Sequence, residues 1–179
     1  MLFPFGHGLS YTTFAYSGLR ISKREFTEEE AVRVSVNITN TGSMTGKEVV
    51  QLYISDLTGS AVRPSKELKG FEKIELEPGE TKTVTMELNK RSFAWYRTDI
   101  QDWYAAEGEY KILIGSSSQN ICLEESVQLV KKIKEPVIYD KNTTVGELLE
   151  NRAAGEYVRS QLKPYLTYFE DGDEDLIFS

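Results

Sequence analysis

Apolar and polar residues alternate along most of the first 130 positions of the chain. In the stretch AVRVSVNIT, the polar positions are Arg33, Ser35 and Asn37, and the apolar positions between them are Val32, Val34, Val36 and Ile38. A period of two residues is typical of a β-strand with one buried and one exposed face. Related patterns predict further strands at residues 11–21, 47–55, 66–76, 81–88, 109–115 and 120–130.

The stretch KEVVQLYIS is apolar on both faces. Val50, Leu52 and Ile54 share one face, and Val49 and Tyr53 lie on the other. Strands that are buried on both sides show this pattern, so we expect a central strand here.

Turn signals separate these stretches, and no convincing helix lies between them. In LEPGE, Pro78 presets φ and Gly79 accepts a positive φ, as a type II turn requires. About seven short strands with this spacing predict an all-β domain, an antiparallel β-sandwich of immunoglobulin type in which two sheets pack face to face. We expect the sandwich to occupy residues 11–130.

The pattern changes near Lys131, where a polar connector with a proline begins. Thr144 and Glu147 then form a capping box, and the period becomes helical. The apolar positions of two short helices are Val145, Leu148, Leu149, Tyr157, Val158 and Leu162, and Pro164 is expected to end the second helix. The pattern of residues 131–179 thus predicts a connector and a small α-helical extension with an acidic end. Helices this short need an apolar surface, so we expect docking on the sandwich or a homo-oligomer contact.

Charge and composition narrow the classes of partner. The chain has 21 basic and 28 acidic residues, and its net charge of -7 argues against nucleic acid and anionic membrane surfaces, which require a positive field. No run approaches about 18 apolar residues, so no membrane span is predicted. A single cysteine, Cys122, and a single histidine, His7, supply neither an internal disulfide nor a zinc site. We expect no metal and no cofactor.

Two motifs suggest chemistry, but each has a simpler interpretation. His7 could act as a general base, yet a catalytic histidine needs an orienting acid and a nucleophile, and the nearby sequence offers only Ser10 and glycines. Near the end of the chain, Asp171, Asp173 and Asp175 alternate like the start of a calcium loop. The glycine position of such a loop falls on Leu176, which favours a solvated acidic terminus.

Four aromatic residues lie within ten positions: Trp95, Tyr96, Trp103 and Tyr104. Flat aromatic faces can stack on sugars, but most aromatic residues of a small sandwich pack in its core or at a sheet edge. Packing is the favoured interpretation. An exposed, coplanar strip of these rings would instead favour a carbohydrate-binding module.

No carboxylate pair stands out for glycoside hydrolysis, which needs two carboxylates on opposite sides of one bond. The acids in turns or on polar faces are Glu28, Glu29, Glu30, Glu75, Glu77 and Glu80. Water keeps such groups ionised, whereas the general acid needs a raised pKa. The sequence therefore predicts no catalytic residue in this chain.

Three stretches together carry a family resemblance. FPFGHGLSYTTF, RPSKELKGFEKIELEPGET and WYAAEGEYKILIGSSSQNI occur in the order and approximate spacing of the fibronectin type III-like domain that closes family 3 glycoside hydrolases, the β-glucosidases and their β-xylosidase relatives. The match covers residues 3 to about 130. TTVGELLENRAAGEYV also resembles a short helical segment that follows this domain in some bacterial members.

The resemblance implies that this chain is a non-catalytic module. In the family, the nucleophilic aspartate and the acid/base carboxylate lie in upstream domains, so no catalytic residue carries over. Residues 1–10 would lead in from those missing catalytic domains, which are the expected partners. The module would stabilise them and could shape the rim of the substrate cleft of a parent enzyme that hydrolyses terminal β-linked sugars with retention. A carbohydrate-binding module and a protein-interaction or oligomerisation module remain as alternatives.

Two motifs carry the resemblance at the residue level. In the first, the matching positions are Pro4, Gly6, Gly8, Leu9, Ser10, Tyr11 and Phe14, and His7 takes a position often held by an aromatic residue, which implies a junction residue. The second comprises Arg63, Pro64, Lys66, Glu67, Leu68, Gly70 and Phe71. Here we expect Leu68 and Phe71 to enter the core, while Arg63 and Lys66 reach outward where a loop docks on a neighbouring domain.

Overall fold

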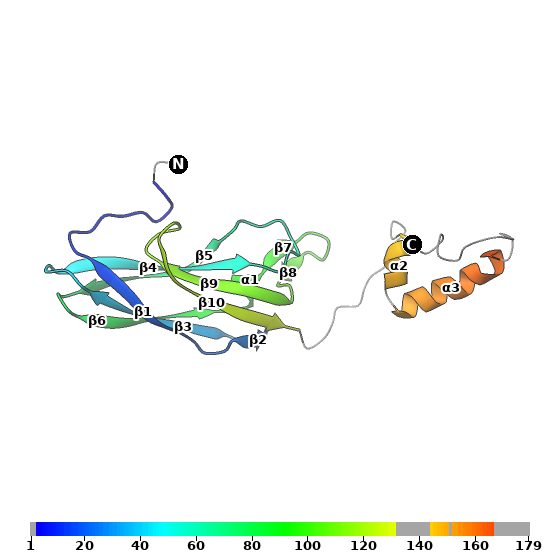
Figure 1. Ribbon diagram of the computed structural model, residues 1–179, viewed down its shortest axis with the longest axis horizontal. Coiled ribbons are helices and arrows are strands. Elements are labelled where there is room, and N and C mark those ends of the chain that lie inside the picture. The colour runs from blue at the N-terminus through cyan, green and yellow to red at the C-terminus, as the bar shows by residue number, and fades with distance from the viewer. Residues whose placement is uncertain (1–2, 132–143, 151, 167–179) are drawn as a thin grey trace. The chain divides into compact units, whose positions relative to one another are not determined.

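The computed structural model describes residues 3–131, 144–150 and 152–166 (Figure 1). The chain divides into two compact units, residues 1–133 and 134–179, and each is described by itself. Apart from one short helix, the regular secondary structure in the described part of the first unit is all β-strand. This confirms the mostly β class that the alternating pattern predicts.

Two larger sheets and one small hairpin make up the first unit. The three-stranded sheet contains, in spatial order, β1 (Phe14–Ile21), β3 (Val32–Asn40) and β6 (Thr81–Leu88). The five-stranded sheet contains, in spatial order, β2 (Glu25–Thr27), β10 (Ile121–Val130), β9 (Gly108–Gly115), β4 (Gly46–Asp56) and β5 (Glu67–Leu76). The hairpin pairs β7 (Trp95–Arg97) with β8 (Asp102–Tyr104). As predicted, β4 lies inside its sheet, between β9 and β5.

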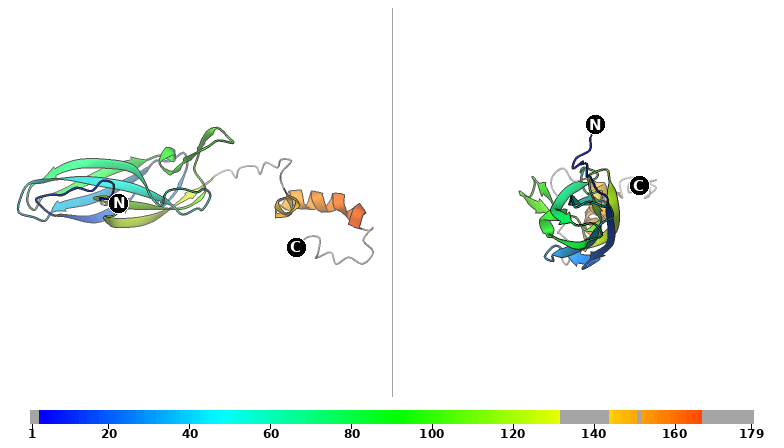
Figure 2. Two further views of the ribbon diagram at one scale, coloured as in Figure 1. Left: turned by 90° about the horizontal axis from the view of Figure 1, so that it is seen from above. Right: turned by 90° about the vertical axis from the view of Figure 1, so that its left-hand side faces the viewer.

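Both larger sheets contribute to one hydrophobic core. Every second residue of β3 is buried, as its alternation predicts, and the facing contributions include Leu52, Ile112 and Leu129 from the five-stranded sheet. Phe93 and Tyr110 meet edge to face, with ring centroids 5.3 Å apart. In the end-on view of Figure 2, the strands of the two sheets surround a common interior.

The structure corrects the strand prediction in three respects. The described residues contain ten strands rather than seven, because β2, β7 and β8 have only three residues each and are too short to show a period. β2 pairs with β10 in parallel, so the arrangement is not purely antiparallel. A one-turn helix, α1 (Lys90–Phe93), was not predicted. It begins with a capping box in which the side chains of Asn89 and Ser92 each accept a hydrogen bond from the backbone N–H of the other residue.

The turn at Pro78 and Gly79 has the expected chemistry. Gly79 has a φ of 77°, and the Glu80 N–H donates to the Glu77 carbonyl at 3.0 Å. The Gly79 N–H in turn donates to the Asn40 carbonyl at 2.9 Å, which ties the turn to the end of β3.

The second unit contains α2 (Val145–Glu150) and α3 (Arg152–Leu166). Two helices were predicted, but the expected stop at Pro164 is wrong, because α3 continues to Leu166. Proline inside a helix removes one backbone hydrogen bond and crowds the carbonyl four residues earlier, and here the helix continues for only two residues beyond it. Gly155 is buried against α2, where an added Cβ would lie 3.0 Å from the Leu149 carbonyl oxygen. The side chain of Leu162 lies outside the described residues.

Candidate domain-docking site

The segment before β1 forms a strap, residues 3–13, that lies along the outer side of the five-stranded sheet (Figure 1). Its first attachment is the side chain of Gln51 in β4, which points away from the core because its neighbours Val50 and Leu52 point into it. The Gln51 amide nitrogen donates to the carbonyls of Gly6, at 3.2 Å, and Ser116, at 2.6 Å. Gln51 is nevertheless buried, since the strap covers it.

Two further bonds complete this attachment. The Tyr53 hydroxyl donates to the Gln51 side-chain oxygen, and the Ser118 N–H donates to the Phe5 carbonyl at 2.9 Å. Gly6 has a φ of 77°, and an added Cβ would lie 2.2 Å from the Gln51 side-chain oxygen. Only glycine fits this position, both for its backbone conformation and for space.

The second attachment is Asn40, the fully buried last residue of β3. Its side-chain oxygen accepts from the Thr12 hydroxyl at 2.7 Å and from the Gly42 N–H at 3.0 Å. Its amide nitrogen donates to the carbonyls of Met44, at 2.8 Å, and Leu76, at 2.9 Å. Each end of the strap is therefore held by a buried side-chain amide whose hydrogen-bonding groups are used.

The strap holds its polar backbone against the sheet and presents apolar side chains to solvent. Leu9 is 94% exposed and Tyr11 is 96% exposed, and Phe3 and Phe5 are each more than half exposed. On the adjacent β5, Phe71 lies opposite Gln51 in the strand register and is 68% exposed. We call Phe3, Phe5, Leu9, Tyr11 and Phe71 the docking surface. Large apolar side chains left exposed on a fixed backbone are candidates for a surface that another protein covers.

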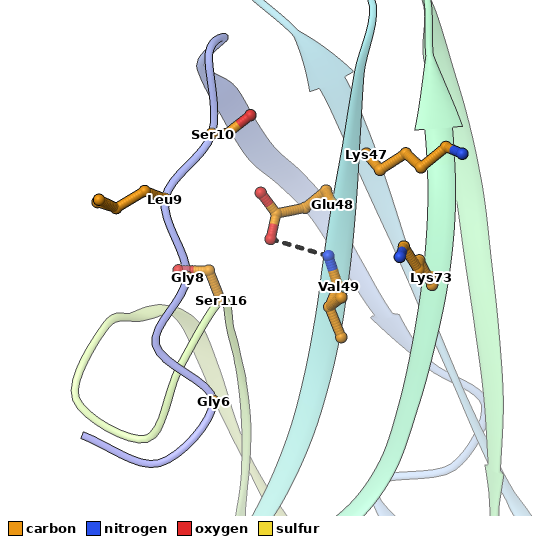
Figure 3. Close-up of a pocket in the computed structure, with 9 residues that line it drawn as sticks. All are labelled: Gly6, Gly8, Leu9, Ser10, Lys47, Glu48, Val49, Lys73 and Ser116. Atoms are coloured by element: carbon orange, nitrogen blue, oxygen red, sulfur yellow. Dashed lines mark hydrogen bonds between the residues drawn. The ribbon is translucent and has the colours of Figure 1, made fainter. Parts of the chain in front are cut away.

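A groove of about 250 Å³ runs between the strap and strands β4 and β5 (Figure 3). Its lining includes Leu9 and Ser10 of the strap, Glu48 of β4 and Lys73 of β5. Burial raises the pKa of Glu48, although its carboxylate accepts a hydrogen bond from the Val49 N–H at 3.0 Å, which favours the ionised form.

The expectations for the second motif are wrong for two residues. Phe71 does not enter the core, because it shares the outer face of the sheet with Gln51. Arg63 does not reach outward, since its side chain is only 8% exposed and pairs with Asp56 at 3.0 Å and Glu67 at 2.8 Å. It also donates to the Phe93 carbonyl at 2.8 Å. The signal that was missed is the placement of acids on both sides of Arg63 in the sequence.

Leu68 and Lys66, the other residues of that prediction, are half-buried. The strand register shifts between Leu52 and Tyr53, where an irregularity in the pairing places Leu68 opposite Tyr53 on the outer face. A shift of this kind reverses which side chains face the core, and the alternation alone does not reveal it.

The four aromatic residues form the β7–β8 hairpin, but they do not form a coplanar strip. The rings of Trp95 and Tyr104 lie 5.0 Å apart at 86°, and those of Tyr96 and Trp103 lie 5.8 Å apart at 71°. Cations lie over the rings of Trp103 and Tyr104. The Arg91 guanidinium lies 3.9 Å from the centre of the Trp103 ring, and the Lys131 ammonium lies 3.8 Å from that of Tyr104.

Comparison with known proteins agrees with this architecture. Residues 48–118 match the fibronectin type III-like domain family. Thermostable beta-glucosidase B of Acetivibrio thermocellus is 48% identical over 162 residues, which cover 90% of this chain and 22% of that protein. The chain contains a fibronectin type III-like domain of the kind found in family 3 β-glucosidases.

Solved structures show the same relationship for this fibronectin type III-like domain. The GH3 beta-glucosidase of Bifidobacterium adolescentis matches with a TM-score of 0.73 and 34% identity, over 87% of this chain and 23% of that one. A further relative, found by sequence, is a putative beta-xylosidase of Formosa agariphila. It is 47% identical over 117 residues, which cover 65% of this chain and 15% of that protein. The chain thus spans less than a quarter of the length of these relatives.

His7 lies in the strap of the fibronectin type III-like domain and is exposed. Its ring stacks on Phe3, with the ring centroids 5.3 Å apart, and its backbone N–H donates to the Pro4 carbonyl at 3.1 Å. These contacts fit the junction role that the resemblance implies, which stays a prediction. Asp171, Asp173 and Asp175 lie outside the described residues.

The acids singled out in the sequence are dispersed over separate turns and strands. Hydrogen bonds from Lys23 and Thr27 hold the pKa of Glu30 at about 2, and the Glu77 N–H and Lys82 lower the pKa of Glu80. Glu75 pairs with Lys47 at 3.7 Å. Glu30 and Glu80 are thus stabilised as carboxylates, which is the opposite of what a general acid requires.

No group of three or more potential metal ligands occurs among the residues that the structure describes. Within the same ranges, no helix is long and apolar enough to cross a membrane. Cys122 is a free, exposed thiol on β10.

Proposed function

We propose that this chain is a non-catalytic structural module of a family 3 β-glucosidase-like enzyme, and that its docking surface packs against the catalytic part of that enzyme. The observation that carries the proposal is the strap. Its backbone is fixed at Gln51 and Asn40, while Leu9 and Tyr11 are left almost fully exposed. A segment fastened in this way presents its apolar side chains in one arrangement, which lowers the entropy that a partner must offset on binding.

The length of the relatives supports this partner. Thermostable beta-glucosidase B extends far beyond the 22% of its length that this chain matches, so a large remainder is available to cover the surface. The parent would hydrolyse terminal β-linked sugars with retention, and the module would stabilise it and contribute to the rim of its substrate cleft.

We further infer that the two larger sheets form a fibronectin type III-like sandwich of seven principal strands, occupying residues 11–130. Seven of the strands in the described part of the chain have eight or more residues: β1, β3, β4, β5, β6, β9 and β10. Their burial in one core supports this arrangement.

A binding experiment tests the docking proposal. The part of thermostable beta-glucosidase B that precedes its matching region is prepared alone and titrated, by calorimetry, with its own matching region and with this chain. We expect both to bind. The double variant Leu9→Ser/Phe71→Ser should bind at least tenfold more weakly, because it removes two anchors of the docking surface.

The control is Val62→Ser, which removes a fully exposed apolar side chain outside the docking surface and should bind like the unaltered chain. Binding of the relative's own region but not of this chain would contradict the proposal. So would equal affinity for the double variant and the control. Light scattering on the same samples separates docking from self-association of the chain.

A further inference from the structure

Glu48 is a charged group of the module that its own fold leaves without a cation. Its half-buried carboxylate accepts from the adjacent Val49 N–H at 3.0 Å, and no described residue forms an ion pair with it. The buried Tyr16 hydroxyl lies near this carboxylate and, apart from the Val49 N–H, is the one donor among the described residues that contributes to lowering the pKa of Glu48. An ionised carboxylate can accept about four hydrogen bonds, so most of its capacity depends on water in the groove.

The lysines nearest to Glu48 in the sequence and on β5 do not form an ion pair with its carboxylate. Figure 3 shows the Glu48 carboxylate pointing toward the strap, whereas the ammonium group of Lys47 points away from it. Lys47 lies 3.7 Å from Glu75 on β5. Lys73 lines the groove from the β5 side, and Ser10 lines it from the strap.

Docking would remove the remaining water from the groove, because Leu9 of the docking surface is part of its wall. A carboxylate that loses its water must gain a proton or a donor, since an unpaired buried charge is strongly unfavourable. The bond from the Val49 N–H favours the ionised form, whereas burial raises the pKa of Glu48 and favours a proton, so the pH dependence of binding must distinguish a donor from a proton. Among donors, a guanidinium group suits this carboxylate best, because it can donate two parallel hydrogen bonds to one carboxylate.

We propose that the groove receives an arginine-type basic side chain from the catalytic part of the parent enzyme, and that this side chain pairs with Glu48. The inference rests on the proposed docking function and identifies a polar contact beside its apolar anchors. Such a contact would set the orientation of the docked module, because an ion pair in a covered groove tolerates little displacement.

The test uses the titration described above with Glu48→Gln, which keeps the shape of the side chain and removes its charge. We expect this variant to bind at least tenfold more weakly, while the isolated chain unfolds at an unchanged temperature. The matched control is Glu72→Gln, which removes the same charge from exposed β5 and should leave binding unchanged.

The outcomes separate this inference from the function on which it rests. If Leu9→Ser/Phe71→Ser weakens binding but Glu48→Gln binds as well as the unaltered chain or better, docking stands and the ion pair is wrong. If neither variant weakens binding, both proposals fail. A third variant, Lys73→Gln, excludes an internal partner. If Lys73→Gln weakens binding as much as Glu48→Gln does, and Glu48→Gln/Lys73→Gln weakens it no further, Glu48 pairs with Lys73 and not with the partner.

The pH dependence distinguishes a cation from a proton. Pairing with a cation lowers the pKa of Glu48 in the complex, so binding should be strongest above the pKa of the free chain and weaken as the pH falls through it. Protonation on docking would give the opposite slope. The comparison is made between the unaltered chain and Glu48→Gln, both carrying His7→Asn so that the strap contains no imidazole. Of the other groups near Glu48, Tyr16 and Cys122 have raised pKa values, Lys73 is a cation in the lining of the groove, and Lys47 is a cation that points away from Glu48.

Discussion

A single glycine determines whether the strap can sit on its sheet. Gly6 combines a positive φ with a backbone that lies against the side chain of Gln51. We expect Gly6→Ala to weaken the attachment of the strap by about 1 to 3 kcal/mol, from strain at that φ and from the clash.

The Ser118 amide reports on this change, because it donates to the Phe5 carbonyl. Its hydrogen exchange should become about tenfold faster or more in Gly6→Ala. Gly8→Ala is the control, since an added Cβ there meets nothing within 4 Å. Equal exchange in the two variants would show that Gly6 is not required for the attachment.

Arg63 is the second residue whose substitution we expect to have a large effect, here on the stability of the module. Its guanidinium satisfies Asp56, whose side chain is only 6% exposed, together with Glu67 and the Phe93 carbonyl. Arg63→Met should destabilise the module by about 3 to 5 kcal/mol, because it leaves a buried carboxylate without its partner. Arg33→Met, which breaks an exposed pair with Glu87, should change stability by about 1 kcal/mol or less. Denaturant unfolding of the two variants checks the difference.

The ion pair between Arg63 and Glu67 predicts that the stability of the module depends on pH. Burial raises the pKa of Glu67, but hydrogen bonds from Lys69 and Arg63 outweigh it and lower the pKa below its ordinary value of 4.5. A lowered pKa in the folded state stabilises the fold above that ordinary value, and this stabilisation is lost as the pH falls through the folded-state pKa. The acid limb of the stability curve should therefore be shallower in Arg63→Met than in the unaltered chain. An unchanged slope would mean that Arg63 does not affect the ionisation of Glu67.

At the scale of elements, the alternating pattern was a sound guide where strands are long. The inward residues of β3 and the interior position of β4 follow directly from the sequence, because one side-chain period fixes one face. Leu68 was misplaced because its face depends on a register irregularity between β4 and β5, which no local pattern records, whereas Phe71 lies in the regular part of the pairing, opposite Gln51 on the outer face. Arg63 was misplaced for a different reason, since its burial depends on acids that only the fold brings together.

The strap could be predicted only in part. Its motif was found in the sequence, and glycine at position 6 signalled a special backbone. The role of Gln51 could not be inferred, because a polar residue on the outer face of a strand is ordinary until another segment covers it.

The β7–β8 hairpin gives a test at this scale. Trp103 is half-buried and packs against the edge of the core, with Arg91 over its outer face. Trp103→Ala should cost about 2 to 4 kcal/mol, less than the removal of a fully buried tryptophan. Loss of binding to a soluble β-glucan with an unchanged unfolding midpoint would instead support a carbohydrate-binding module. The unaltered chain is titrated with the same glucan as the reference.

At the scale of the whole molecule, the first unit has its own core and should not need the helices to fold. Deletion of residues 134–179 should leave the unfolding midpoint of the β unit unchanged, because every residue of the hydrophobic core in the described part of the chain precedes Lys134. Scanning calorimetry of the full and shortened chains checks this. A shortened chain that does not fold would show that the helical part completes the core, and that the predicted boundary near Lys131 is wrong. Light scattering on the two chains tests whether the helices mediate self-association.

The central claim is that this chain contributes stability and no catalysis, and enzyme activity tests it most directly. Thermostable beta-glucosidase B without its matching region is heated alone, with this chain, or with Leu9→Ser/Phe71→Ser, and the remaining hydrolysis of an aryl β-glucoside is followed over time. We predict that the unaltered chain lengthens the half-life of the activity, that the double variant does not, and that the chain alone releases no product. Turnover by the chain alone that a single carboxylate substitution abolishes would contradict the account, as would a half-life that the chain leaves unchanged.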